Sequence, residues 1–126
     1  MGPKSDSQQL PESELGNGYS LLRTARDGDG VTLAISGEID IANAEAFTNE
    51  VNSLFEGADG QLTLDLQNCR FIDSAGIRAL MVVAQEQRAR ARTLKLSGAG
   101  GEPLRVLELS GLLDSGLFAS DNRRQP

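Results

Sequence analysis

The stretch FIDSAGIRAL (Phe71–Leu80) decides the fold, because it joins a strand pattern directly to a helix pattern. Before it, leucines alternate with other residues, as in a strand with one buried face; they are Leu62, Leu64 and Leu66. After it, apolar residues recur at the spacing of one helix face; they are Ile77, Leu80, Met81 and Ala84. A strand that leads at once into a helix is the repeating unit of α/β sheets.

The sequence before this stretch predicts a β-hairpin and a helix. Gly18–Ala25 and Val31–Ile35 have strand patterns, and the turn-forming run Asp27–Gly30 between them predicts a hairpin. A helix is predicted over Asp40–Phe55, with Asp40 or Asn43 as its cap. Its apolar residues lie on one stripe; they are Phe47, Val51, Leu54 and Phe55.

The sequence after this stretch predicts a further strand and helix. Thr93–Ser97 is the strand, and the helix runs from Pro103, a good first helical residue, to about Ser110, with Gly111 at the left-handed position after its end. A weak last strand or helix is expected near 117–119. The order β-β-α-β-α-β-α predicts the α/β class, with a mixed sheet, parallel pairs and crossover helices.

The composition predicts one domain. A chain of 126 residues is long enough to bury one core. Residues 1–17 have no aromatic residue and no periodic apolar pattern, so we expect a flexible N-terminal tail, a domain over 18–120 and a flexible tail over 121–126.

The charge and residue types exclude several functions. Gly18–Ser120 carries nine Lys and Arg against fourteen Asp and Glu, a net charge of about −5, which argues against nucleic acid or an acidic membrane as a direct partner. The chain has no apolar run of membrane-spanning length and no signal-peptide pattern, so we predict a cytoplasmic protein. With one cysteine and no histidine the chain cannot build the usual His or His/Cys zinc site, and a Ser-His-Asp hydrolase is excluded. No bound cofactor or metal is implied.

The residues Asp73, Ser74, Ala75 and Gly76 carry the functional hypothesis. Either Ser74 or Asp73 can cap the helix that follows, and a cap alone is the simplest interpretation. Gly76, however, lies in the first turn, where alanine would suit a plain helix better, so something requires a bare backbone there. Close approach of another molecule is one such requirement, and small residues at the carboxyl end of a strand would leave the Ser74 hydroxyl within reach of a second protein.

Three blocks of the sequence resemble, in order, the bacterial STAS domains of the anti-sigma factor antagonist family. LDLQNCRFIDSAGIRAL (Leu64–Leu80) is similar to the family's signature, in which a strand ends in Asp-Ser-Ser/Ala-Gly before an amphipathic helix. SGEIDIANAEAF (Ser36–Phe47) and LKLSGAGGEPLRVLELSGL (Leu94–Leu112) resemble the first helix with its preceding turn and the last strand, loop and helix. The resemblance covers Tyr19–Phe118.

The resemblance implies a switch in which proteins exchange partners. It implies that Ser74 is phosphorylated by an anti-sigma factor that is itself a serine kinase and binds the ATP. It also implies that the unphosphorylated antagonist binds this anti-sigma factor and frees a sigma factor, and that a serine phosphatase reverses the modification. On this resemblance Asp40, Asp73, Ala75 and Gly76 form the docking surface with Ser74, and the protein is a monomer without catalysis of its own. Where several relatives have a second serine, this chain has Ala75.

A second interpretation stays open. The same domain can be a constitutive interaction module of a transporter or of a stress-signalling assembly, in which Ser74 is not modified.

Overall fold

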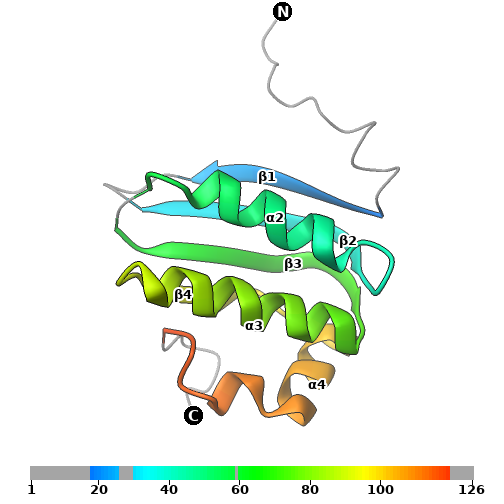
Figure 1. Cartoon of the computed structure of the whole chain (residues 1–126). Helices are drawn as coiled ribbons and strands as arrows, with labels where there is room; N and C mark the ends of the chain where they lie inside the picture. Colours follow the sequence, from blue (N-terminus) through cyan, green and yellow to red (C-terminus); the bar gives the residue numbers. More distant parts are fainter. Residues whose placement is uncertain (1–17, 26–29, 59, 120–126) are drawn as a thin grey trace, which may run out of the picture.

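The computed structural model describes residues 18–25, 30–58 and 60–119. Its four strands form one mixed sheet in the order β1-β2-β3-β4 (Figure 1). They are β1 (Tyr19–Ala25), β2 (Val31–Ile39), β3 (Leu62–Ile72) and β4 (Leu94–Ser97). β1 pairs antiparallel with β2, whereas β3 pairs parallel with both β2 and β4. The predicted hairpin strands and mixed sheet are confirmed; residues 27–29 of the predicted turn lie outside the described residues.

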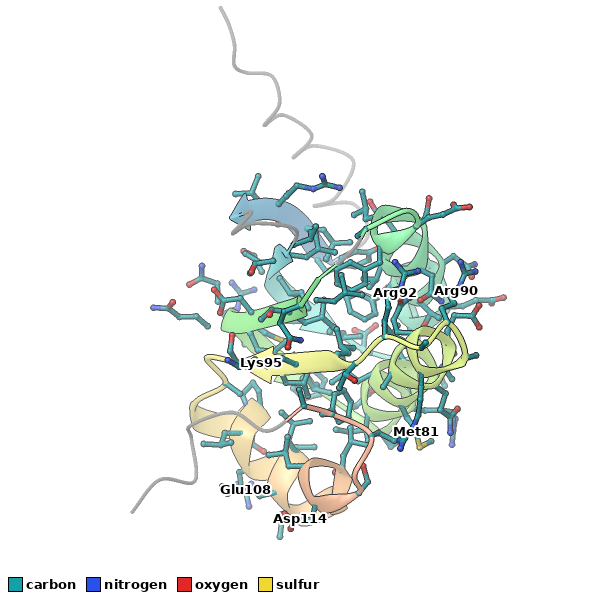
Figure 2. The ribbon with its side chains drawn as sticks, turned by 90° about the vertical axis from the view of Figure 1, so that its left-hand side faces the viewer. Met81, Arg90, Arg92, Lys95, Glu108 and Asp114 are labelled. Atoms are coloured by element: carbon teal, nitrogen blue, oxygen red, sulfur yellow. The ribbon has the colours of Figure 1, made fainter. Side chains whose placement is uncertain are left out.

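Three α-helices connect or follow the strands. They are α2 (Ala44–Phe55), α3 (Ser74–Ala89) and α4 (Gly101–Ser110), and a short 3-10 helix, η2 (Leu112–Asp114), follows α4. α2 and α3 lie side by side over one face of the sheet, and α4 lies across β4 from α3 (Figures 1 and 2). The predicted order of strands and helices is confirmed. The weak last element near 117–119 is a single parallel bridge between Phe118 and Leu94.

The core lies between the sheet and the α2–α3 layer. The strands bury every second side chain there, as the leucine alternation predicts; examples are Leu33, Ile35, Leu62, Leu64 and Leu66. α2 buries Phe47, Val51 and Phe55, three of the four predicted stripe residues, and Leu54 is half-buried. α3 buries Leu80 and Ala84 as predicted, but Ile77 and Met81 lie at the margin of the core.

Several predicted boundaries are wrong for local physical reasons. β2 continues past Ile35 to Ile39, because Ser36 and Gly37 stay in the strand; the pairing shifts register twice, and each time β3 carries the extra residue. A start of α2 at Asp40 is wrong, whereas the alternative with Asn43 at the cap position is confirmed: α2 begins at Ala44, because Asp40 starts a turn in which its carbonyl accepts from the amide N–H of Ala44 at 2.8 Å. α4 begins at Gly101, so Pro103 is its third residue, where a missing N–H also costs no helical hydrogen bond. Gly111 has the predicted left-handed conformation, with φ 78°.

No helix among the described residues is both long and apolar enough to cross a membrane.

Candidate functional site

The carboxyl ends of β2 and β3 bring the predicted site residues together. The two strands are parallel neighbours, and their last residues, Ile39 and Ile72, are paired. Asp40 and Asp73 follow these residues directly, and each leads into a turn or a helix start. In Figure 1 this edge is on the right, where both α2 and α3 begin. We call it the motif end of the molecule.

Asp73 caps α3 and also joins the two turns. Its Oδ1 accepts a hydrogen bond from the Gly76 amide at 3.0 Å, and its Oδ2 accepts from the Ile41 amide at 3.2 Å. Its own amide donates to the Ile39 carbonyl at 3.2 Å. The sequence left Ser74 or Asp73 as the cap, and the structure assigns the cap to Asp73.

Ser74 is therefore not needed as the cap. It is the first residue of α3, it is exposed, and its hydroxyl has no hydrogen bond with the described residues. Ala75, which follows it, is half-buried and adds only a methyl group to the surface. A hydroxyl that the fold does not use is thus presented to solvent at the start of a helix.

Gly76 is buried, and its bare backbone has an intramolecular cause. A Cβ atom at this position would lie 2.6 Å from the Ile39 carbonyl oxygen and 2.8 Å from Cγ2 of Ile72. Real Cβ atoms essentially never come so close to such neighbours. The close approach that the sequence suggested is therefore made by β2 and β3, and Gly76 sets how closely the start of α3 packs on the sheet.

The turn after β2 is held by its own side chains. Asp40 Oδ1 accepts from the Ala42 amide at 3.0 Å, and the Asp40 amide donates to Asn43 Oδ1 at 2.9 Å. Asn43 is buried, and its Nδ2 donates to the Glu38 carbonyl at 3.0 Å. Asn43 thus stands at the cap position of α2, but its side chain fixes the turn and makes no cap hydrogen bond to the helix.

Two residues beside the motif were missed by the sequence analysis. Ile41 is 82% exposed at the tip of the Asp40 turn, and Arg78 is exposed one helical turn after Ser74. Both line a mostly apolar groove of about 340 Å³ between α2 and α3, together with Ala44, Glu45, Thr48, Asn49, Ala75, Ala79 and Val82. The sequence did contain signals for both residues. Ile41 is an apolar residue outside the predicted helix stripe, and Arg78 lies four residues after Ser74, a spacing that puts the two on one helix face.

Packing accounts for the single cysteine. Cys69 is buried, its thiol lies 3.7 Å from the Phe71 carbonyl, and burial raises the pKa of the thiol above its usual value. A raised pKa disfavours the reactive thiolate. No group of three or more His, Cys, Asp or Glu side chains suited to a metal ion occurs in the described ranges.

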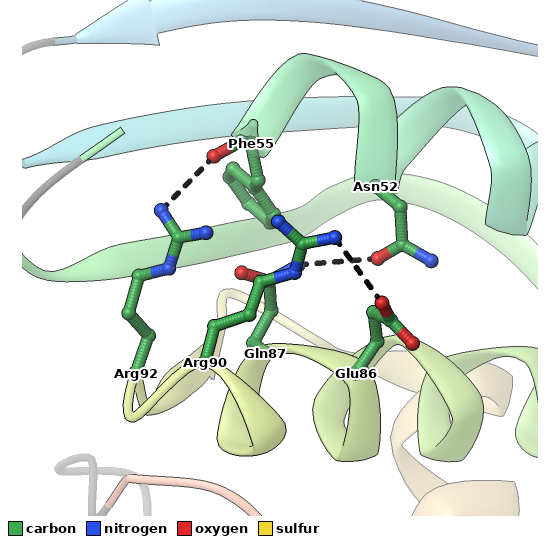
Figure 3. A network of polar contacts seen from close by, with 6 residues as sticks. All are labelled: Asn52, Phe55, Glu86, Gln87, Arg90 and Arg92. Atoms are coloured by element: carbon green, nitrogen blue, oxygen red, sulfur yellow. Dashed lines mark hydrogen bonds and ion pairs between the residues drawn. The ribbon is translucent and has the colours of Figure 1, made fainter. Parts of the chain in front are cut away.

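The opposite end of the α2–α3 pair is held by arginine and glutamine. Arg92 donates to the carbonyls of Phe55, at 3.2 Å, and Ala58, and Gln87 Nε2 donates to Asn52 Oδ1 at 3.2 Å (Figure 3). Arg90 forms an exposed ion pair with Glu86 at 3.3 Å. Figure 2 shows Arg90 and Arg92 on this side of the molecule, which we call the arginine end.

Comparison with known protein families identifies the family of this chain. Residues 22–118 match the family model described as "Mlab, STAS domain". The chain belongs to the STAS domain family. The family resemblance seen in the sequence is thereby confirmed, and the fold around Asp73 and Ser74 is that of a STAS domain.

A curated relative of this STAS domain comes from Bordetella bronchiseptica and is named "Putative anti-sigma factor antagonist BtrV". It is 31% identical over 98 residues, which cover 77% of this chain and 83% of the relative.

Solved structures share the fold at lower identity. An anti-sigma factor antagonist from Mycobacterium paratuberculosis has a TM-score of 0.64 at 20% identity, covering 79% of this chain and 83% of its own. The Bacillus cell fate determinant SpoIIAA in its phosphorylated form has a TM-score of 0.54 at 23% identity, covering 82% and 93%. A sulfate transporter family protein from Wolinella succinogenes has a TM-score of 0.62 at 20% identity, covering 73% and 75%. At these identities the likeness shows the fold alone.

Proposed function

We propose that this STAS domain is an anti-sigma factor antagonist that is switched by phosphorylation of Ser74. The observation that carries the proposal is the exposed Ser74 hydroxyl, which is left free because Asp73 caps the helix in its place. The curated Bordetella relative supports the antagonist role, and SpoIIAA, a fold relative, is known in unphosphorylated and phosphorylated forms. The unphosphorylated chain binds the anti-sigma factor and thereby frees a sigma factor.

In the proposed phosphorylation, this chain supplies only the nucleophile. Ser74 Oγ attacks the γ-phosphorus of an ATP molecule bound by the anti-sigma factor kinase, and its proton passes to a base of that kinase. The new Oγ–P bond replaces the bond between the γ-phosphorus and the bridging oxygen, and ADP leaves. A serine phosphatase restores the hydroxyl by directing water to the same phosphorus. The STAS chain itself is proposed to catalyse neither step.

The proposed docking surface consists of Asp40, Asp73, Ser74 and Ala75, with Gly76 beneath it. A phosphate of charge about −1.5 to −2 on Ser74 stands at a helix N-terminus, which tolerates negative charge, so the fold is preserved. The same phosphate adds negative charge and a desolvation cost beside two carboxylates at a surface that binds its partner with a neutral hydroxyl. Phosphorylation therefore weakens the complex without unfolding the domain.

The test is a pull-down from a source-cell extract with wild type and Ser74→Glu as paired baits, followed by addition of ATP and intact-mass analysis. The matched control is Ser53→Glu, which adds the same charge at an exposed position of α2. We expect wild type and Ser53→Glu to recover a small ATPase-fold protein, Ser74→Glu to lose it, and one phosphoryl group to appear on Ser74. Equal recovery by all three baits, with no change in mass, would refute the switch.

A second candidate function is a constitutive interaction module of a transporter or stress-signalling assembly. The sulfate transporter family structure with this fold favours it. In that case the motif end binds its partner whether or not Ser74 carries a charge. Recovery of transporter components by both wild type and Ser74→Glu would support this function over the first.

A further inference from the structure

Arg78 differs from the other arginines of the described ranges in having no partner there. Arg70, Arg90 and Arg105 each form an ion pair with a glutamate. The remaining arginines donate to backbone carbonyls; they are Arg23, Arg88 and Arg92. Arg78 is exposed on α3 and has neither an ion pair nor a hydrogen bond with any residue that the structure describes.

The acids around Arg78 do not neutralise it. Asp73 uses both carboxylate oxygens on backbone amides, those of Gly76 and Ile41. Glu45 lines the same groove from α2, but no ion pair joins it to Arg78. The guanidinium therefore stands at the motif end as a cation that no described acid engages.

Ser74 and Arg78 are four residues apart on the same helix. Side chains at this spacing lie on one face, with Cβ atoms about 6 Å apart. A long arginine side chain and a phosphate on the serine can meet across this distance, and the planar guanidinium can donate two parallel hydrogen bonds to phosphate oxygens.

We propose that Arg78 is the intramolecular partner of the phosphate on Ser74. This inference rests on the proposed function, since it concerns the regulation of the same serine. Arg78 lines the α2–α3 groove beside Ala75 and Ile41. Pairing with the phosphate draws the guanidinium toward the start of α3. Phosphorylation thus replaces a free hydroxyl and a free cation with one internal ion pair, which withdraws two contacts from the partner together.

The test measures the phosphate directly and needs no kinase. Phosphoserine is incorporated at position 74 during protein synthesis, and the second pKa of its phosphate is measured by ³¹P NMR titration in the full chain. A nearby cation favours the dianion and so lowers this pKa. We expect Arg78→Gln to raise it by about 0.3 units or more, the size of one surface i,i+4 ion pair, and Arg78→Lys to restore part of the difference.

Arg88→Gln is the matched control, because it removes the same charge from the same helix at a position about 20 Å along the helix axis from Ser74. Asp40, Glu45 and Asp73 lie at the motif end or line the groove, and Glu38 lies near the end of β2; all four are unchanged in every variant, so the difference isolates Arg78. An Arg78→Gln value within about 0.1 unit of the parent, on the scale of a resolvable pKa difference, would overturn the inference. Failure to find a kinase would instead contradict only the proposed function, because the phosphate is installed without one.

Discussion

The two ends of the α2–α3 pair use polar side chains in opposite ways. At the motif end, Asp40, Asn43 and Asp73 are short side chains that bond to nearby backbone groups and fix two turns. At the arginine end, Gln87 and Arg92 reach from α3 and the turn after it to α2 and the turn that follows it (Figure 3). At the motif end these short side chains bond to backbone groups of the two turns and leave the surface open, whereas at the arginine end long side chains join two helices and the turns after them.

The two ends also differ in what they leave unsatisfied. At the motif end the Ser74 hydroxyl is exposed to water, so leaving it without a protein partner costs little. At the arginine end Gln87 Oε1 and Arg92 Nε are buried without a hydrogen-bond partner among the described residues. The unpaired buried atoms at the arginine end cost stability that its crossing hydrogen bonds must offset, whereas the unpaired hydroxyl at the motif end costs the fold little and is available for binding.

The largest expected effect on stability comes from Gly76→Ala. The added methyl group would lie 2.6 Å from the Ile39 carbonyl oxygen, so α3 must shift away from the sheet. We expect a loss of about 3 kcal/mol in the free energy of unfolding, measured by denaturant titration. Gly100→Ala is the control: a Cβ there meets nothing within 4 Å, and we expect a loss below about 1 kcal/mol. If the Gly76→Ala protein were as stable as the wild type, packing against β2 and β3 would not explain the glycine, and contact with a partner would be the better explanation.

Arg92→Met tests the arginine end. Methionine keeps an apolar stem but removes the hydrogen bonds to Phe55 and Ala58, so we expect a loss of about 2 kcal/mol in the free energy of unfolding. Arg90→Met, which removes only an exposed ion pair, should change it by less than about 0.5 kcal/mol. Similar losses in the two variants would show that the crossing hydrogen bonds are not what holds this end.

Asp73 variants separate the two bonds at the motif end. Asp73→Ala removes the cap and the bond to the Ile41 amide, and should lower the free energy of unfolding by about 1.5 kcal/mol. Asp73→Asn keeps one acceptor oxygen for the Gly76 amide, so its loss should be about 0.5 kcal/mol. If urea unfolding gives the same loss for both, the bond to Ile41, and not the helix cap, carries the stabilisation.

The smallest structural effect concerns Cys69. Burial raises the pKa of the thiol, so at pH 8 the folded chain holds less thiolate than the unfolded chain. The stability gained from the neutral thiol is present at pH 7 and is lost as the pH rises through the raised pKa. Iodoacetamide labelling followed by mass spectrometry should be at least about tenfold slower in the folded protein than in guanidinium. Equal labelling rates would contradict the burial of this thiol and make Cys69 a candidate redox group.

Periodicity predicts much of this fold from the sequence. The alternation at Leu62–Leu66 and the helix stripes at Phe47–Phe55 and Ile77–Ala84 depend on local spacing, and the structure buries most of these residues. Ser36 and Gly37 have no apolar side chain to continue the β2 pattern, so the predicted β2 ends too early, and the turn at Asp40 delays the start of α2 to Ala44.

The candidate site is predictable only in part. The residue types of Asp73 and Ser74 indicate a capped helix start, but which of them caps depends on where β3 ends. Position 76 requires glycine because the Ile39 carbonyl oxygen is so close. Ile39 belongs to another element, and no local sequence pattern connects it to Gly76. Likewise Arg78 has no ion-pair partner among the described residues because of where the fold places Asp73 and Glu45. The spacing of these residues in the sequence does not predict that placement.

The most direct test of a switch at Ser74 compares binding and stability in one pair of proteins, wild type and Ser74→Glu. Affinity for the purified anti-sigma factor and the free energy of unfolding are measured for both. We predict at least about a tenfold loss of affinity, or about 1.4 kcal/mol, from a like charge at the docking surface. The free energy of unfolding should change by less than about 0.5 kcal/mol, as for an exposed substitution. Equal affinities, or a loss of stability as large as the loss of binding, would contradict the claim that Ser74 acts as a switch on binding.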